Sequence, residues 1–272
     1  MITGLILLIL LFLLLGILHR KAQERLAEAV CVRERLEVVG HWGCFPEMDS
    51  HLLKSLKHSE MNLLFFPVRR ADASRMYFSR SMLTDVRATG KILVASVRFA
   101  DLEPEGIPSL LKRILDQGFD GMVVGDLNLG MGRERIMEQM ALWARWARQQ
   151  DSDFLIFQRG SLRIVLSPEA EEADDWGRKH LDTLDGILVE GAVFDGLHPR
   201  PVEELERTEK ILRIYFENPE KKCKVFLSEA IWDSLDPEAQ SNRERTKWFL
   251  DWAEERGFYP CVVPIRTSSF QG

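Results

Sequence analysis

Two short segments of the chain share one pattern, and each has the character of a strand that is buried on both faces. Phe119–Asp126 and Leu184–Glu190 each place Asp-Gly before three apolar residues, and each then reaches a loop. Continuous apolar runs that follow helical stretches are typical of parallel strands covered on both sides. At the C-terminal end of the pattern the first segment has Gly125 and the second has Glu190.

The same alternation of strand-like and helix-like segments extends over most of the chain. Eight strands are predicted, at 37–42, 62–68, 91–99, 122–126, 154–158, 186–190, 223–228 and 259–265. Seven helices are predicted between them, at 49–59, 79–89, 108–117, 133–150, 170–183, 202–216 and 242–256. Eight strands alternating with helices predict an α/β fold of the (β/α)8 TIM-barrel type.

The alternative architecture is an open, doubly wound sheet. When that fold binds dinucleotides, it carries a glycine-rich turn directly after the first strand. Here the first predicted strand runs into Gly40-His41-Trp42-Gly43-Cys44, and no G-x-G-x-x-G motif follows. The barrel is therefore the favoured interpretation.

The first residues form a separate segment. Residues 2–18 are almost entirely apolar, and about 26 Å of helix is just enough to cross a thin bilayer. No small-residue cleavage site follows and no basic residue precedes this run, which favours an uncleaved anchor over a signal peptide. We expect a single transmembrane anchor at 1–21, a charged helical neck at 22–35 and a barrel domain at 36–272.

Two arguments about the orientation in the membrane disagree. His19, Arg20, Lys21 and Arg25 follow the apolar run, and positive flanks tend to stay in the cytoplasm, which would place the barrel there. The family resemblance described below implies export instead. The side of the membrane stays open.

Composition and motifs argue against several classes of protein. The formal net charge of −6 offers no basic field for nucleic acid. The four cysteines form no C-x-x-C, so a structural zinc site is not expected, although a carboxylate metal site stays open. No P-loop, G-x-S-x-G or H-E-x-x-H is present, and no cofactor is expected.

Barrel enzymes place their functional groups where the strands end at the C-terminal side. On the predicted strands these residues are His41, Trp42, Arg69, Arg70, Arg98, Asp101, Glu103, Asp126, Asn128, Gln158, Arg159, Glu190, Glu229 and Arg266. A rim of carboxylates, guanidinium groups and amides suits ligands rich in hydroxyl or amino groups, such as sugars.

Glycoside cleavage requires two carboxyl groups that flank the scissile bond. Glu190 and Asp126 are the predicted catalytic pair, and the alternative for Glu190 is an ion pair with Arg159 or Arg98 that closes the barrel mouth. The alternative for Asp126 is a cap on the following loop. Asp120 and Asp185 begin their strands at the opposite end, where we expect turn or cap residues. The predicted substrate-binding residues are Gln158, Asp101, Glu103, Arg159 and Trp42.

Three motifs resemble consecutive signatures of glycoside hydrolase family 114, the endo-α-1,4-polygalactosaminidase-like barrels. They are Gly118-Phe119-Asp120-Gly121, the strand 154–158 that ends in Gln158, and the strand 185–190 that ends in Glu190. Residues 92–103 are similar to the third strand of the family, including its acidic pair. The resemblance implies a barrel that acts on an amino-sugar polysaccharide.

The chain departs from the family at two positions. The strand-four aspartate of the family aligns with Gly125, and the family's Gln-Asn pair is Gln158-Arg159 here. Asp126 could replace the missing carboxylate only if its side chain were re-aimed, because neighbouring residues of a strand point to opposite faces. Two functions stay open: an active glycosidase, and an impaired barrel that binds a saccharide or a protein partner at the membrane. The sequence does not indicate an oligomeric state.

Overall fold

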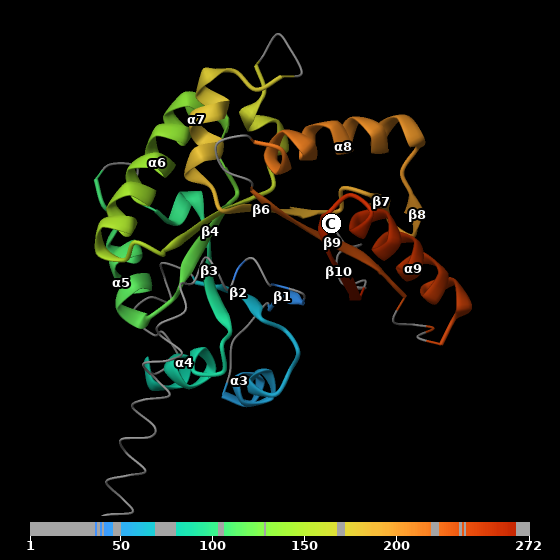
Figure 1. Cartoon of the computed structure of the whole chain (residues 1–272), viewed down its shortest axis with the longest axis horizontal. Helices are drawn as coiled ribbons and strands as arrows, with labels where there is room; N and C mark the ends of the chain where they lie inside the picture. The colour runs from blue at the N-terminus through green and yellow to red at the C-terminus, as the bar shows by residue number, and fades with distance from the viewer. Residues whose placement is uncertain are drawn as a thin grey trace, which may run out of the picture.

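In the computed structural model, eight parallel strands curve into a barrel (Figure 1). The structure describes residues 36, 39, 41–45, 50–68, 80–102, 106–127, 129–167, 172–218, 223–233, 236 and 238–264. The strands, in sheet order, are β1 (Trp42–Cys44), β2 (Leu63–Pro67), β3 (Ile92–Arg98), β4 (Gly121–Gly125), β5 (Leu155–Arg159), β6 (Gly186–Glu190), β9 (Lys224–Trp232) and β10 (Tyr259–Pro264). Between β10 and β1, the indole Nε1 of Trp42 donates to the carbonyl oxygen of Tyr259 at 3.0 Å. The predicted barrel is confirmed.

A helix follows each of the first seven strands in the sheet and packs on the outside of the barrel (Figure 1). These helices are α3 (Ser50–Lys57), α4 (Arg80–Arg87), α5 (Ser109–Gln117), α6 (Arg133–Gln150), α7 (Asp175–Thr183), α8 (Val202–Phe216) and α9 (Gln240–Glu254). Short 3-10 turns, η2 (Phe99–Asp101), η3 (Leu129–Met131) and η4 (Leu162–Val165), follow β3, β4 and β5. A hairpin of β7 (Phe194–Asp195) and β8 (His198–Pro199) follows β6.

The inside of the barrel is filled with apolar and aromatic side chains. Trp42, Phe65, Phe157 and Phe226 contact one another edge to face, with ring centroids 5.5 to 6.1 Å apart. Such contacts add to the free energy gained by burying the rings. The interior of the barrel is therefore a packed core, and a ligand can approach this interior only at the two ends of the barrel.

The Asp-Gly pattern has a structural cause that is the same in both segments. The Asp120 carboxylate accepts from the backbone N–H of Leu93 at 2.9 Å and lies 2.8 Å from the Arg87 guanidinium. The Asp185 carboxylate accepts from the backbone N–H of Ile156 at 2.7 Å and from Arg148 at 2.8 Å. Each aspartate thus joins the start of its strand to the neighbouring strand and to a helix. Both lie at the strand starts as predicted, but they bridge to other elements where a turn or cap role was predicted.

The glycines of the two motifs allow a neighbouring strand to approach closely. A Cβ atom at Gly121 would lie 2.6 Å from the carbonyl oxygen of Leu155, and one at Gly186 would lie 2.7 Å from that of Lys224. Both distances are far below van der Waals contact, so a side chain at either position would push the strands apart.

The first strand differs from its prediction. The sequence predicted a strand at 37–42, whereas β1 covers Trp42–Cys44. Val39 is buried in the interior cluster together with Trp42 instead of lying in a described strand. The residue at the C-terminal end of β1 is therefore Cys44, and Trp42 lies at the N-terminal end.

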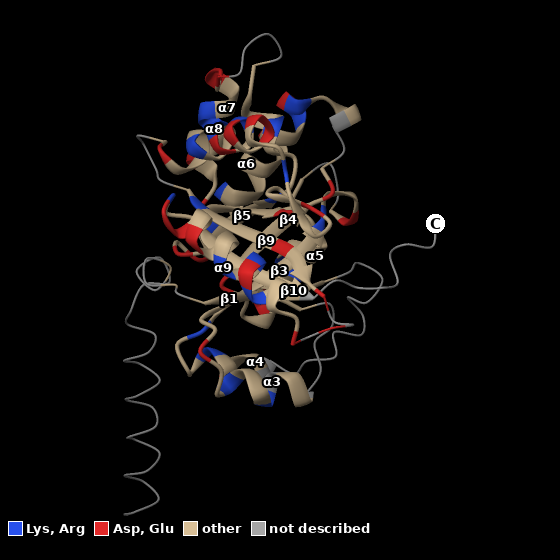
Figure 2. Ribbon diagram, turned by 90° about the vertical axis from the view of Figure 1, so that its right-hand side faces the viewer, with Lys and Arg blue, Asp and Glu red and all other residues tan. Residues whose placement is uncertain are grey.

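The predicted anchor at 1–21 and the neck at 22–35 lie outside the described residues. In the part of the chain that the structure describes, no helix is long and apolar enough to cross a membrane. Basic and acidic residues alternate along the outer helices (Figure 2), and neither sign dominates one face in that view.

Candidate active site at the barrel mouth

Residues that point into the barrel form a polar layer at the C-terminal ends of the strands. Side chains alternate along each strand, so the interior residues Val123, Phe157 and Leu188 place Gly125, Arg159 and Glu190 on the same inward face. Gly125 is level with Arg98 on β3, and Glu190 is level with Ser228 on β9. The mouth of the barrel therefore gathers charged groups above an apolar core.

Glu190 and Arg159 form an ion pair at the centre of this layer. The Arg159 Nε donates to Glu190 Oε2 at 3.0 Å, and its Nη2 donates to Oε1 at 2.9 Å and to Oε2 at 2.7 Å. Both side chains are more than 40% exposed, at 42% and 44%, so the pair is open to a ligand. The ion pair that the sequence offered as the alternative role of Glu190 is present, and a substrate must share or displace the guanidinium.

The stem of the same arginine packs beside Gly125, the position where the family resemblance implies a carboxylate. A Cβ atom at Gly125 would lie 3.4 Å from both Cβ and Cδ of Arg159. The two departures from the family motif, Gly125 and Arg159, are therefore related, because the Arg159 stem packs where glycine has no side chain. A side chain at Gly125 would contact the stem of Arg159.

Asp126 follows the last residue of β4, where the backbone leaves the strand conformation. Its φ angle is +51°, in the left-handed region that aspartate tolerates better than most residues. The pKa of Arg98 is raised, first by its hydrogen bonds to Asp101 and also by the Asp126 charge. Burial lowers the pKa of Arg159, but its hydrogen bonds to Glu190 and the charges of Glu190 and Asp126 raise it overall. The Asp126 carboxylate is therefore near enough to both guanidinium groups for its charge to act on them.

Asp101 is paired with Arg98 at the edge of the mouth. The Arg98 Nε and Nη2 donate to the two carboxylate oxygens of Asp101 at 2.9 and 2.8 Å. The Asp101 side chain is 13% exposed and that of Arg98 is 60% exposed. Glu103, its predicted partner in the acidic pair, lies outside the described residues.

Gln158 is the first of two predicted binding residues that lie away from the mouth in the structure. Its side chain points outward toward the helices and is fully buried. Its Nε2 donates to the carbonyl oxygens of Gly160 and Ser161 at 2.8 and 3.2 Å, and its Oε1 lies 2.8 Å from His180 Nε2. Gln158 therefore positions the loop after Arg159 and is not available to a ligand at the rim.

Trp42 is the second predicted binding residue that lies away from the mouth. Its side chain is 3% exposed and packs at the N-terminal end of the barrel interior, two residues below the end of β1. The prediction that Trp42 binds substrate at the rim is therefore wrong, because the strand begins at this residue and does not end there.

Two thiols of the mouth were not recognised from the sequence. Cys44 on β1 packs with Cys261 on β10 against the interior cluster. Burial, followed by the Glu190 charge, raises the pKa of Cys44 to about 12, and burial raises that of Cys261 to about 11. Both remain neutral thiols near neutral pH, which makes them poor nucleophiles.

A cleft of about 580 Å³ opens directly beside Glu190. It lies between the loop after β5, the loop after β6 and helix α8. Its polar lining consists of Ser161, Arg163, Glu190, Arg200, Glu204, Arg207 and Thr208. Arg200 is held by the carbonyl oxygen of Gly191 at 3.2 Å and by Glu204 at 3.3 Å. This mixture of donors and acceptors suits a hydroxylated ligand that reaches Glu190.

Glu229 anchors the loop that carries this cleft. It lies on the outward face of β9 and is 1% exposed, and its Oε1 accepts from the backbone N–H of Val193 at 2.8 Å. Burial raises the pKa of Glu229 to about 7, although backbone N–H groups of Val193, Ala192 and Phe194 oppose the shift. Glu229, which the sequence placed at the rim, instead lies beneath the loop that follows Glu190.

The raised pKa of Glu229 predicts a pH dependence of stability. Between about 4.5 and about 7 the folded protein keeps a proton that the unfolded chain loses, so the free energy of unfolding falls as the pH rises through this window. The loss amounts to roughly 3 kcal/mol at most. Urea unfolding at pH 5 and pH 8 should show this loss in the wild type and a smaller one in Glu229→Gln. Equal losses in both proteins would show that Glu229 titrates normally.

Comparisons with known proteins identify the fold of the domain that carries this site. No protein-family model and no curated protein matches the chain. The structure is similar to the glycoside hydrolase domain of PelA from Pseudomonas aeruginosa, with a TM-score of 0.51, 12% identity, and 84% of this chain and 94% of that chain covered. It is also similar to an oxaloacetate acetylhydrolase, with a TM-score of 0.50, 16% identity, and 87% and 80% covered. These likenesses show a barrel fold that hosts more than one chemistry.

Proposed function

We propose that this protein is a glycoside-hydrolase-like barrel that acts on an amino-sugar polysaccharide of the α-1,4-galactosaminan type. The observation that carries the proposal is that two carboxylates act on Arg159 at the mouth, Glu190 through hydrogen bonds and Asp126 through its charge. Glycoside cleavage requires two carboxyl groups across the scissile bond. The resemblance to glycoside hydrolase family 114 implies this substrate class, and the fold is similar to that of a glycoside hydrolase domain.

The roles follow from the surroundings of each group. Glu190 acts as one catalytic carboxyl group once a sugar displaces the Arg159 guanidinium from it, and Asp126 acts as the other. Arg159 and Asp101 bind substrate hydroxyl or acetamido groups. The cleft beside Glu190 receives the neighbouring sugar unit, where hydroxyl groups pair with the guanidinium groups and with Glu204.

A second function is favoured by one specific observation. The Arg159 stem packs beside Gly125 and its guanidinium binds both oxygens of Glu190, an arrangement that suits binding of a saccharide without cleavage. In that case the protein is a catalytically impaired barrel that binds a saccharide or a protein partner at the membrane. The predicted N-terminal anchor would hold either form of the protein at a bilayer.

Hydrolysis of partially de-N-acetylated galactosaminan by the full chain tests the proposal. We expect new reducing ends with the wild type and at least a hundredfold lower rate with Glu190→Gln, about the contribution of one general acid or base. Glu203→Gln is the matched control, because Glu203 is an exposed residue in the first turn of α8. Binding without cleavage in the wild type would favour the impaired barrel, and equal rates in wild type and Glu190→Gln would contradict the assigned role of Glu190.

A further inference from the structure

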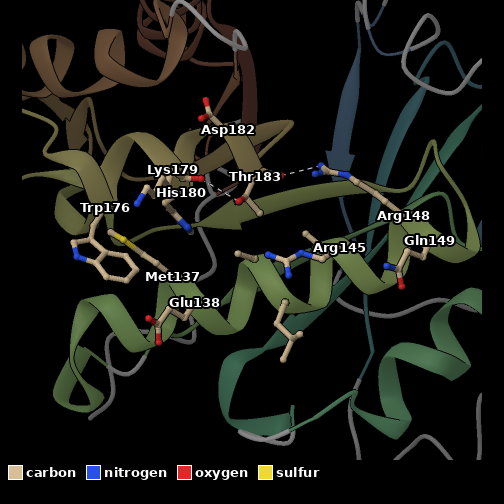
Figure 3. Close-up of a pocket in the computed structure, with 13 residues that line it drawn as sticks. Met137, Glu138, Arg145, Arg148, Gln149, Trp176, Lys179, His180, Asp182 and Thr183 are labelled. Carbon is tan, nitrogen blue, oxygen red and sulfur yellow. Dashed lines mark hydrogen bonds between the residues drawn. The ribbon is translucent and has the colours of Figure 1, made fainter.

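A second cavity lies on the outer wall of the barrel, between helices α6 and α7 (Figure 3). Its volume is about 790 Å³, larger than that of the cleft beside Glu190. Trp176 and Met137 lie at one end of this groove, and Arg148 and Gln149 lie at the other. Both helices start at the C-terminal side of the barrel, so the Trp176 end is the one nearer the mouth.

The lining of the groove combines an apolar surface with polar groups of both kinds. The apolar part consists of Met137, Ala141, Leu142, Ala144 and Trp176. The polar part supplies donors from Arg145, Gln149 and Lys179, and acceptors from Glu138 and Asp182. An apolar surface with a few placed polar groups is the usual character of a small-ligand site.

Trp176 gives the groove an exposed aromatic surface. Its side chain is 38% exposed although it is a large apolar residue, and the Lys179 ammonium lies 5.6 Å from its ring centroid. The C–H face of a pyranose ring is apolar and flat enough to pack on an indole, while the hydroxyl groups at its edge reach polar neighbours. A sugar ring therefore fits both parts of the lining.

His180 provides a hydrogen-bond acceptor inside the groove that no described residue satisfies. Gln158 uses its Nε2 as donor to Gly160 and Ser161, so its Oε1 must accept from His180 Nε2 at 2.8 Å. The neutral imidazole then carries its proton on Nε2, and Nδ1 is an acceptor. Burial, helped by the Arg133 charge, lowers the pKa of His180 to about 4, so this tautomer persists at neutral pH.

The Nδ1 atom is buried and has no partner in the described part of the chain, which is uncommon for a buried polar atom. A hydroxyl group is the simplest donor for it. Through Gln158, the same histidine also supports the loop that follows Arg159. The groove is thus joined to the mouth by one chain of hydrogen bonds.

We propose that the groove between α6 and α7 is a second saccharide-binding site, in which a sugar ring packs on Trp176 and a hydroxyl group donates to His180 Nδ1 once the side chains that cover this atom move aside. The choice of a sugar as occupant rests on the proposed function of the mouth. A polymer that extends from the mouth over the ends of β4 and β5 would reach the Trp176 end first. The groove would then hold the polysaccharide while a distant part of it occupies the mouth.

The test uses the full chain with Glu190→Gln, so that the probe is not cleaved, and a tetramer of N-acetylgalactosamine as that probe. Calorimetry should detect two classes of site. Trp176→Ala should weaken one class by about tenfold, as expected for loss of a large aromatic contact. Trp248→Ala is the matched control, because Trp248 has the same 38% exposure but lies on α9. Leu142→Arg should block the same class by filling the groove from α6.

Nitrogen-15 NMR of labelled histidine gives an independent readout. The His180 Nδ1 resonance, identified by its loss in His180→Asn, should shift when the tetramer binds. A single class of site, unaffected by Trp176→Ala and Leu142→Arg and without a His180 shift, would overturn the groove proposal and leave the mouth proposal standing. Binding at the groove alone would instead contradict the proposed function of the mouth, and no binding at all would contradict both.

Discussion

Replacing Asp185 with alanine is expected to lower the free energy of unfolding by about 3–5 kcal/mol. The Asp185 side chain is 3% exposed and accepts from Arg148 and from the backbone N–H of Ile156. Its removal leaves a guanidinium that is 22% exposed without this carboxylate, and a buried N–H without its acceptor. Removing one partner of a buried pair costs far more than the pair contributes by itself.

Urea unfolding measures this effect, with two comparisons. Asp116→Ala, an exposed residue of α5, should change stability by less than about 0.5 kcal/mol. Asp185→Asn keeps an acceptor for Ile156 but loses the charge, so its stability should lie between those of the wild type and Asp185→Ala. A loss below about 1 kcal/mol for Asp185→Ala would show that the Asp-Gly motif does not hold the strands together as described.

For the second function, in which the barrel is catalytically impaired, restoring the carboxylate pair that the family resemblance implies should increase hydrolysis by about 10² to 10⁴ fold. The variant combines Gly125→Asp with Arg159→Asn. Asparagine removes the Arg159 stem, which lies 3.4 Å from the new Cβ atom, and also frees Glu190. Carboxylates on β4 and β6 would then be separated by two strand spacings of about 4.8 Å, a range that glycosidases use.

The matched control is Gly125→Asn with Arg159→Asn, which has the same shape but lacks the carboxylate. Reducing-end release from partially de-N-acetylated galactosaminan compares the two variants with the wild type. Equal rates in both variants would contradict the view that the impaired barrel lacks only a carboxylate at position 125.

The sequence predicted the number and order of the strands because each apolar run is bounded by helical patterns and turn residues. The aspartates were placed correctly at the strand starts, but the predicted turn or cap role differs from the bridge to the neighbouring strand that both make. The ion pair of Glu190 with Arg159 was one of two alternatives and is present in the structure.

Which face of a strand a side chain occupies was harder to predict. Strands covered on both sides are apolar throughout, so periodicity does not distinguish the interior from the helix side. Gln158 and Glu229 therefore seemed available at the rim, whereas both point toward the helices and are buried. The end of β1 was misplaced by two residues because Val39 packs in the interior cluster, and this error moved Trp42 to the wrong end of the barrel.

Features that depend on segments far apart in the sequence could not be predicted from a local sequence pattern. His180 lines the groove between α6 and α7, and a hydrogen bond to Gln158 on β5 sets the orientation of its ring. The left-handed backbone angle of Asp126, which follows a glycine, depends on how β4 ends in the folded barrel. Neither feature follows from residue spacing alone.

The central claim is that a saccharide binds at the mouth between Glu190 and Asp126. A crystal structure of the Glu190→Gln protein with a tetramer of partially de-N-acetylated galactosamine tests it most directly. We predict a sugar ring above Gly125, with its glycosidic oxygen between residue 190 and Asp126 and the Arg159 guanidinium moved onto the ligand. A mouth that stays closed by Arg159 at saturating tetramer would contradict the claim.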